Sequence, residues 1–288
     1  MSTLNTIESE SSLYRPEETL RFYDAIGDGE WVHLEGTAYG RLKAVIHTDF
    51  VKEFVRPGDR VLDVGCGPGR FSIEAAKLGA SVTLLDISRG QLMMATDRIA
   101  AAGQADGLNG MIVADITHHP VDVEFDVVMC FGGALSYVVE QRERAAANLV
   151  RVTKPGGTLL VSVMSRLGSN IVTGAADSFV LKDPERWKLW EILADGNLPQ
   201  FPARVEGIDL HPIFHLYRSD ELRALFPACD ILEMASTPVT TYEGSKQFEE
   251  LVEDEKIWIY AVRLERELCR EPGLVDRGNQ LIMAARKR

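Results

Sequence analysis

The sequence predicts an α/β protein in which helices cover a mostly parallel sheet. Short apolar runs alternate with amphipathic helical segments from residue 60 onward, which is the pattern of consecutive βαβ units. The first runs are nearly continuous in apolar residues, as expected for strands that are buried on both faces. The chain has 288 residues and a hydrophobic content of 45%, which suffices for one large globular domain.

Residues 60–165 contain five predicted strands and three predicted helices. The strands are expected at 60–64, 81–87, 110–116, 125–131 and 158–165. The helices are expected over 70–80, over a segment capped by Ser88 that runs through Ile99, and over 141–152. Gly79 ends the first of these helices, and the KPGG sequence at 154–157 ends the third.

The alternation is interrupted after residue 165, where insertions separate the remaining core elements. Helices are predicted over 183–196, over 218–226 with Ser219 as a candidate cap, and over 245–270. The last two strands are predicted at 231–236 and 280–288. We therefore expect a helical cover over 1–55 and a core over 56–288, with a substrate cap formed by the insertions 167–213 and 239–279.

Composition and charge exclude several classes of function. The formal net charge of −12 disfavours non-specific binding to nucleic acid or to an anionic membrane surface. The four cysteines form no CxxC pair, and no histidine cluster has metal-ligand spacing, so neither a disulfide scaffold nor a metal site is expected. The N-terminus does not resemble a signal peptide and no apolar run approaches 18 residues. A cytoplasmic, soluble protein is the expectation.

The most informative segment is the glycine turn DVGCGPGR at 63–70. A dinucleotide fingerprint would require a third glycine at the position of Arg70, and a phosphate-binding P-loop would require a lysine after the glycines. Neither requirement is met. What remains is Asp63, two residues before the first glycine, and a second acid, Asp86, which lies 21 residues after Gly65.

This pattern suits S-adenosylmethionine, which carries a sulfonium and an ammonium group. Glycine permits close approach of the backbone to a ligand, and the turn supplies it at Gly65, Gly67 and Gly69. Asp63 can attract the ammonium group, and Asp86 can accept hydrogen bonds from both ribose hydroxyls. Asp115 ends the third strand, within reach of the adenine amino group.

With these motifs the sequence resembles class I S-adenosylmethionine-dependent methyltransferases. The shared segments are VLDVGCGPGRFS, VTLLDIS, MIVADIT, FDVVMCFGGALSYV, LVRVTKPGGTLLVSV and LIMAARKR. The resemblance implies a Rossmann-like sheet of seven strands in the order 3-2-1-4-5-7-6, with the last strand antiparallel and the ligand at the carboxyl ends of the strands. It also adds four candidate cofactor-binding residues, Cys66, Ile87, Ile116 and Phe131.

The segments around the ligand edge predict the acceptor and the catalytic residues. Three covers over one edge favour an enclosed pocket, and hence methyl transfer by SN2 displacement to an oxygen or nitrogen of a small metabolite. In the N-terminal cover, Tyr23 is a candidate cofactor contact and Arg41 a candidate partner of the methionine carboxylate. The candidate catalytic residues are His215, His33 and Tyr137.

Alternative functions remain open from the sequence. They are an RNA or protein methyltransferase, a non-catalytic S-adenosylmethionine-binding protein, and a polyamine synthase. The last is disfavoured because FGGALSYV at 131–138 contains no acidic residue. The apolar face of 245–270 is compatible with a homodimer.

Overall fold

A seven-stranded sheet forms the centre of the molecule. The computed structural model describes residues 13–169 and 182–288. The strand order is β10-β11-β5-β4-β1-β2-β3. The strands are β1 (Arg60–Val64), β2 (Ser81–Asp86), β3 (Leu108–Val113), β4 (Phe125–Cys130), β5 (Thr153–Met164), β10 (Cys229–Thr237) and β11 (Gln280–Lys287). Counted along the chain within this sheet, β10 is the sixth strand and β11 the seventh, so the predicted order is confirmed.

Strand pairing brings the carboxyl ends of five strands to one edge. β1 pairs in parallel with β2 and β4, so that Asp63 stands between Leu84 and Met129. The β2–β3 and β4–β5 pairs are also parallel. β11 runs antiparallel to both β5 and β10, as predicted for the last strand. The glycine turn, which follows β1, therefore lies at the edge where β2, β3, β4 and β5 also end.

Helices cover both faces of this sheet. On one face lie α4 (Arg70–Lys77) and α5 (Arg89–Ala101), and on the other lie α6 (Arg142–Arg151) and α10 (Ser219–Ala224). Leu92 and Ile99 of α5 are fully buried, as is Leu149 of α6. Apolar side chains on both faces explain why the central strands have nearly continuous apolar sequences.

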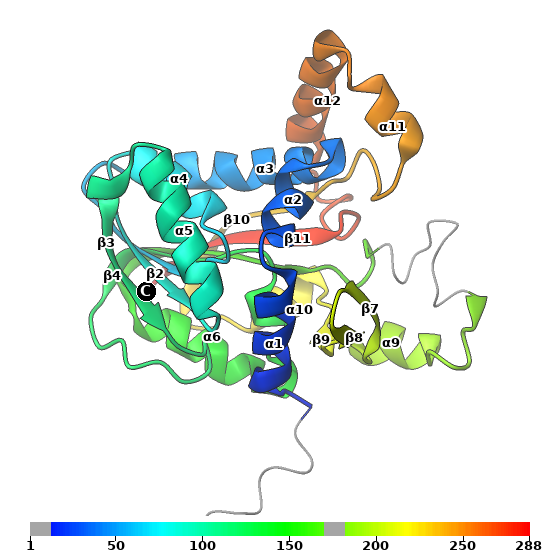
Figure 1. Ribbon diagram of the computed structural model, residues 1–288, viewed down its shortest axis with the longest axis horizontal. Coiled ribbons are helices and arrows are strands. Elements are labelled where there is room, and N and C mark those ends of the chain that lie inside the picture. The colour runs from blue at the N-terminus through cyan, green and yellow to red at the C-terminus, as the bar shows by residue number, and fades with distance from the viewer. Residues whose placement is uncertain (1–12, 170–181) are drawn as a thin grey trace, which may run out of the picture.

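The N-terminal cover consists of three helices, the last of which packs on the face of the sheet that α4 also covers. They are α1 (Pro16–Ile26), α2 (Gly29–Glu35) and α3 (Ala38–Phe54) (Figure 1). The side-chain amide of Gln91 donates hydrogen bonds of 3.0 Å to the carbonyl oxygens of Tyr23 and Gly27. The hydroxyl of Ser88 donates to Asp24 at 2.5 Å, and the same side chain caps α5 as predicted. These contacts attach α1 to the first turn of α5.

The first insertion differs from the predicted helical cap. Its helix α9 (Leu189–Asp195) begins six residues later than expected and ends at Gly196, which has a left-handed φ of 83°. Two small antiparallel pairs accompany it, β6 (Asn197–Leu198) with β9 (Phe214–His215) and β7 (Phe201–Val205) with β8 (Ile208–His211). The turn at Gly207, with φ of 78°, joins β7 to β8. Residues 170–181 of this insertion lie outside the described residues.

The second insertion contains two helices where one was predicted. They are α11 (Lys246–Leu251) and α12 (Glu255–Leu268), and the single helix over 245–270 is wrong. The carboxylate of Asp254 accepts a hydrogen bond of 2.8 Å from the backbone N–H of Lys256, so a new helix begins there. Both helices lie beyond α3 (Figure 1), and Arg266 of α12 forms an ion pair of 2.7 Å with Asp49 of α3.

Other boundaries also differ from the predictions. β3 ends at Val113, so Asp115 follows the third strand and does not end it. β5 begins at Thr153, so the KPGG sequence lies within the strand and does not precede it. Ser219 does not cap α10, because α10 begins at Ser219 itself and its hydroxyl donates to Asp276 at 2.6 Å.

Candidate active site

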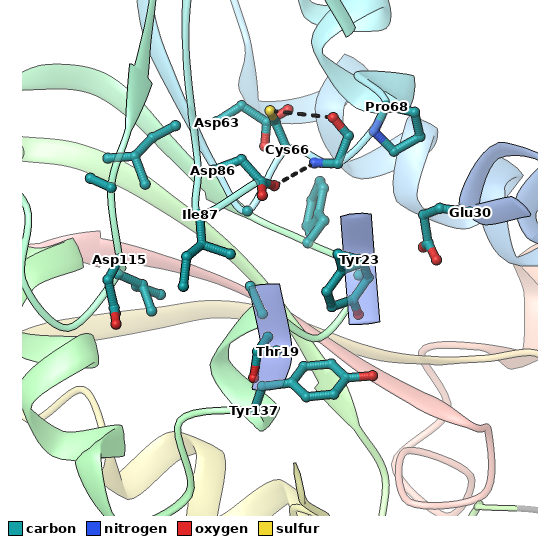
Figure 2. Close-up of a pocket in the computed structure, with 18 of the residues that line it drawn as sticks. Thr19, Tyr23, Glu30, Asp63, Cys66, Pro68, Asp86, Ile87, Asp115 and Tyr137 are labelled. Atoms are coloured by element: carbon teal, nitrogen blue, oxygen red, sulfur yellow. Dashed lines mark hydrogen bonds between the residues drawn. The ribbon is translucent and has the colours of Figure 1, made fainter. Parts of the chain in front are cut away.

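A pocket of about 870 Å³, mouth included, lies between the N-terminal cover and the carboxyl ends of the strands (Figure 2). Most of the predicted cofactor residues line it, together with one predicted catalytic residue. They are Tyr23, Asp63, Gly65, Cys66, Gly67, Asp86, Ile87, Asp115, Ile116, Phe131 and Tyr137. None of its lining residues comes from 182–213 or 239–279, so in the described chain the N-terminal cover alone closes it.

Two positions of the turn require glycine, because of their backbone conformation and because a side chain would not fit there. Gly65 has a φ of +67°, and a Cβ atom there would stand 2.5 Å from the Cβ of Ala134. Gly69 has a φ of +83° and a Cβ there would stand 2.9 Å from the Cβ of Ala95. Gly69 does not line the pocket. Its place in the motif is explained by the packing of α4 against α5.

Asp63 is buried beneath the turn. Only 2% of its surface is exposed, and the hydroxyl of Ser72 donates to Oδ2 at 2.5 Å. Burial raises the pKa of Asp63 to about 7, although the hydrogen bond from Ser72 opposes this shift. A cationic ligand nearby would favour the charged form of Asp63.

Asp86 ends β2 and holds the glycine turn in place. Oδ2 accepts a hydrogen bond of 2.9 Å from the backbone N–H of Gly67 (Figure 2). Oδ1 accepts one of 2.8 Å from the backbone N–H of Ser88. Burial raises the pKa of Asp86 to about 6. Each carboxylate oxygen retains a second lone pair that can accept a ligand hydroxyl.

Asp115 lies on the far side of the pocket, close behind the end of β3. Oδ1 accepts a hydrogen bond of 2.6 Å from the backbone N–H of Thr117, and Oδ2 accepts one of 2.7 Å from the hydroxyl of Tyr14. Tyr14 also lines the pocket and was not predicted. The only local signal is an aromatic residue just before Pro16, which begins α1.

The charges of the pocket favour a cation. Its described lining residues include four carboxylates, those of Asp63, Asp86, Asp115 and Glu30, and one basic side chain, Arg70. Arg70 already forms ion pairs with Glu35 and Glu74. The pocket therefore presents an excess of negative charge.

Glu30 is the lining carboxylate that the sequence analysis missed. Figure 2 shows it beside Pro68, on the opposite side of the pocket from Asp115. Burial raises the pKa of Glu30. Glu30 is one of three acids in the sequence DGEWVHLE and belongs to no motif, so only the packing of α2 over the glycine turn brings it to the site.

Three candidate residues lie away from the pocket. Arg41 is exposed, and its guanidinium lies 4.8 Å from the centre of the Trp258 ring. Nε2 of His33 lies 3.0 Å from Nζ of Lys43, whose positive charge lowers the pKa of His33 to about 3. The third is His215, which is also absent from the lining residues.

His215 is a buried link between the first insertion and α10. Its Nδ1 lies 2.8 Å from Oδ1 of Asn197 and its Nε2 lies 2.6 Å from Oε1 of Glu221. Glu221 also pairs with Arg166 at 2.6 Å. The structure thus gives His215 polar partners on both ring nitrogens and places it outside the residues that line the pocket.

Tyr137 is the candidate catalytic residue that the structure does place at the pocket. Its ring packs edge-on against the ring of Tyr23, with centroids 5.6 Å apart. Its hydroxyl lies 3.4 Å from Nε2 of His211.

Among residues 13–169 and 182–288, no group of three or more His, Cys, Asp or Glu side chains could hold a metal ion. Within the same ranges, no helix is long and apolar enough to cross a membrane.

Comparison with known proteins identifies relatives that are described as methyltransferases. A family described as "Methyltransferase domain" matches residues 61–157. The chain is 34% identical over 197 residues to a ubiquinone/menaquinone biosynthesis C-methyltransferase of Ectopseudomonas mendocina (strain ymp), which covers 67% of this chain and 74% of the relative. It is 30% identical over 188 residues to methyltransferase GfsG of Streptomyces halstedii, over 62% of this chain and 63% of the relative. A malonyl-[acyl-carrier protein] O-methyltransferase of Serratia marcescens is matched over 40% of its length.

Solved structures share the fold at low sequence identity. Magnesium protoporphyrin IX methyltransferase from Synechocystis PCC 6803, with S-adenosylhomocysteine bound, has a TM-score of 0.61 at 16% identity and covers 95% of this chain and 99% of that one. The [4+2]-cyclase SpnF has a TM-score of 0.58 at 19% identity, over 94% and 96% of the two chains. The cofactor of the methyltransferase family, S-adenosylmethionine, is also the cation predicted from the glycine turn. The chain belongs to the family of class I S-adenosylmethionine-dependent methyltransferases.

Proposed function

We propose that this protein transfers the methyl group of S-adenosylmethionine to an oxygen or nitrogen of a small metabolite by SN2 displacement. The observation that carries the proposal is the pocket itself, which is lined by the glycine turn, four carboxylates and one already paired arginine. A ligand with a sulfonium and an ammonium group matches this charge, whereas a pyrophosphate would be repelled.

The residues at the pocket suggest how the cofactor would lie. Asp86 would accept hydrogen bonds from the ribose hydroxyls, and Asp115 one from the adenine amino group, with Ile87 and Ile116 against the adenine ring. Asp63, beneath the turn, would attract the ammonium group of the cofactor. The reactive methyl would then face the side of the pocket where Tyr137 and Glu30 lie (Figure 2).

Methyl transfer from S-adenosylmethionine depends more on the alignment of the acceptor with the methyl group than on a strong acid or base. S-adenosylmethionine supplies an electrophilic methyl on a sulfur that leaves without protonation. The protein has to hold the acceptor in line with that methyl, and such positioning can contribute about 7–11 kcal/mol. Closure by α1 and α2 supports a small acceptor, because an RNA or a protein side chain would need an open groove.

Two relatives define the competing functions. One is described as a C-methyltransferase, so carbon is the alternative acceptor atom to test. One structural neighbour is described as a [4+2]-cyclase, so this fold also occurs in a protein described by a different reaction. A role in which the cofactor is bound without methyl transfer, including a non-catalytic one, is therefore the second candidate.

The test is calorimetric titration with S-adenosylmethionine, S-adenosylhomocysteine and NAD. We expect the first two to bind, and Asp86→Ala to weaken both by at least about tenfold, because hydrogen bonds to charged groups contribute roughly 1.5–3 kcal/mol each. Asp97→Ala, which removes an exposed carboxylate of α5, is the matched control. Binding of NAD alone would overturn the proposal. Binding without S-adenosylhomocysteine formation on any acceptor would favour the non-catalytic role.

A further inference from the structure

Tyr137 and His211 come from distant parts of the chain and meet at the pocket. Tyr137 follows the short helix η2 (Ala134–Ser136) after β4, and His211 ends β8 in the first insertion. The hydroxyl of Tyr137 lies 3.4 Å from Nε2 of His211. Tyr137 lines the pocket, and His211 lies behind it, outside the lining residues. The insertion therefore contacts the site through this pair.

The surroundings of His211 determine which ring nitrogen carries the proton. Nδ1 lies 2.9 Å from the carbonyl oxygen of Pro212, and a carbonyl oxygen can only accept a hydrogen bond. Nδ1 of the neutral ring therefore holds the proton and donates to Pro212. Nε2 is then left with its lone pair, and the hydroxyl of Tyr137 is the donor to it.

Aromatic rings hold His211 in this orientation. Its ring stacks on Phe201 with centroids 4.5 Å apart and an angle of 10° between planes, and it lies 4.4 Å from the ring of Phe22. Burial lowers the pKa of His211 to about 4, which keeps the ring neutral at physiological pH. Burial also raises the pKa of Tyr137, so its oxygen keeps its proton.

We propose that Tyr137 and His211 form a proton-accepting pair that equips the site for a hydroxyl acceptor, an inference that rests on the proposed function. As the acceptor oxygen bonds to the methyl carbon, the electron pair of the C–S bond remains on sulfur. The acceptor proton passes to the oxygen of Tyr137, and the proton of Tyr137 passes to Nε2 of His211. The imidazolium then returns its proton to solvent. Tyr137 is the catalytic residue and His211 the positioning residue behind it.

The pair distinguishes between classes of acceptor. A hydroxyl group loses its proton as it is methylated, and a positioned base contributes typically 10²–10⁴-fold to such a step. An amine that arrives neutral attacks through its free lone pair and releases a proton afterwards. A hydrogen-bonded Tyr–His pair at the pocket therefore favours a phenol, enol or alcohol over an amine.

The first test examines the pair without turnover. The full-length protein, with ¹⁵N-labelled histidine and saturated with S-adenosylhomocysteine, is compared with its Tyr137→Phe variant by NMR, with His211→Gln used to assign the signals. We expect a neutral His211 protonated at Nδ1, and a shift of its Nε2 signal in Tyr137→Phe that no other histidine shows. A proton on Nε2, or no response of His211 to Tyr137→Phe, would overturn the pair.

The second test measures methyl transfer to a panel of phenols, enols and alcohols and to amines of matched shape. We expect Tyr137→Phe and His211→Gln to lower kcat on hydroxyl acceptors at least about 100-fold. KM and the Kd for S-adenosylmethionine should stay within about threefold. Tyr260→Phe, on the exposed face of α12, is the matched control. Turnover of amines alone, or of no hydroxyl compound despite cofactor binding, would overturn the inference. Failure of the wild-type protein to bind S-adenosylmethionine would instead contradict the proposed function.

Discussion

The hydroxyl of Tyr14 donates a hydrogen bond of 2.7 Å to Oδ2 of Asp115, across 101 positions of sequence. The backbone N–H of Tyr14 also lies 3.1 and 3.2 Å from the two carboxylate oxygens of Glu140. These bonds attach the segment before α1 to the end of the pocket where we propose that adenine binds. The N-terminal cover is thereby coupled to a predicted cofactor residue.

Tyr14→Phe should weaken S-adenosylmethionine binding by about 3- to 30-fold. The substitution keeps the ring in the pocket wall but removes the donor that orients Asp115. A hydrogen bond to a charged group contributes roughly 1.5–3 kcal/mol, and only part of this is lost from binding because Tyr14 acts through Asp115. Calorimetry gives the Kd directly, with Tyr260→Phe as the control for loss of an exposed hydroxyl. An unchanged Kd would show that cofactor binding at Asp115 does not depend on the hydrogen bond from Tyr14.

Binding of the cationic cofactor should weaken as the pH falls. Burial raises the pKa of Asp63 to about 7 and that of Asp86 to about 6, so both carboxyls gain protons between pH 7.5 and 5.5. Only the carboxylate forms attract a cation. We expect the Kd for S-adenosylmethionine to rise at least about tenfold over this range, because a full pH unit of linked protonation corresponds to a factor of ten.

Two variants test whether Asp63 causes this dependence. Asp63→Asn should bind weakly at pH 7.5 and show a flatter profile. Ser72→Ala removes a hydrogen bond that lowers the pKa of Asp63, so its profile should move to higher pH. Titration calorimetry at pH 5.5, 6.5 and 7.5 provides the comparison, and profiles that coincide with that of the wild type would exclude Asp63.

His47 should make the protein sensitive to acid. It is buried in α3 between Phe71 and Phe131, and burial lowers its pKa to about 3. A folded-state pKa below the ordinary value of 6.5 means that its contribution to stability is present above pH 6.5 and is lost as the pH falls towards 3. As the pH falls from 6 to 4.5, the free energy of unfolding of His47→Phe should therefore decrease by about 1.4 kcal/mol less per pH unit than that of the wild type.

Urea denaturation at several pH values measures this difference in slope. Thr48→Val alters the neighbouring buried position of α3 without removing a titrating group, so it should keep the wild-type slope. Equal slopes for His47→Phe and the wild type would mean that His47 is protonated as readily in the folded as in the unfolded chain.

Glu265 of α12 should be essential for the stability of the second insertion. Its carboxylate is fully buried and accepts hydrogen bonds from the backbone N–H groups of Val239 and Thr240, at 2.9 and 3.1 Å, and from the hydroxyls of Thr237 and Thr240. Glu265→Ala leaves these donors buried without a partner and should lower the free energy of unfolding by about 3 kcal/mol. Glu265→Gln should cost less, since its carbonyl oxygen still accepts. A loss under about 0.5 kcal/mol in Glu265→Ala would contradict this role.

Local sequence patterns predicted the parts of the fold that depend on local chemistry. The apolar run at 60–64 and the turn that follows it were recognisable because a buried parallel strand and a glycine turn each have their own composition. The break between α11 and α12 was missed because the apolar spacing continues through 252–258. The side chain of Asp254 ends that continuity by capping a new helix.

The sequence by itself determined the sheet, the glycine turn and the acidic residues Asp63, Asp86 and Asp115. Each of these follows from spacing within a strand–turn–helix unit, where neighbours in sequence are neighbours in space. Only the tertiary structure decided that Tyr14 and Glu30 close the pocket, that Arg41 and His215 lie elsewhere, and that His211 meets Tyr137. Those contacts join segments far apart in the chain, and their partners depend on how whole helices pack, which no local pattern records.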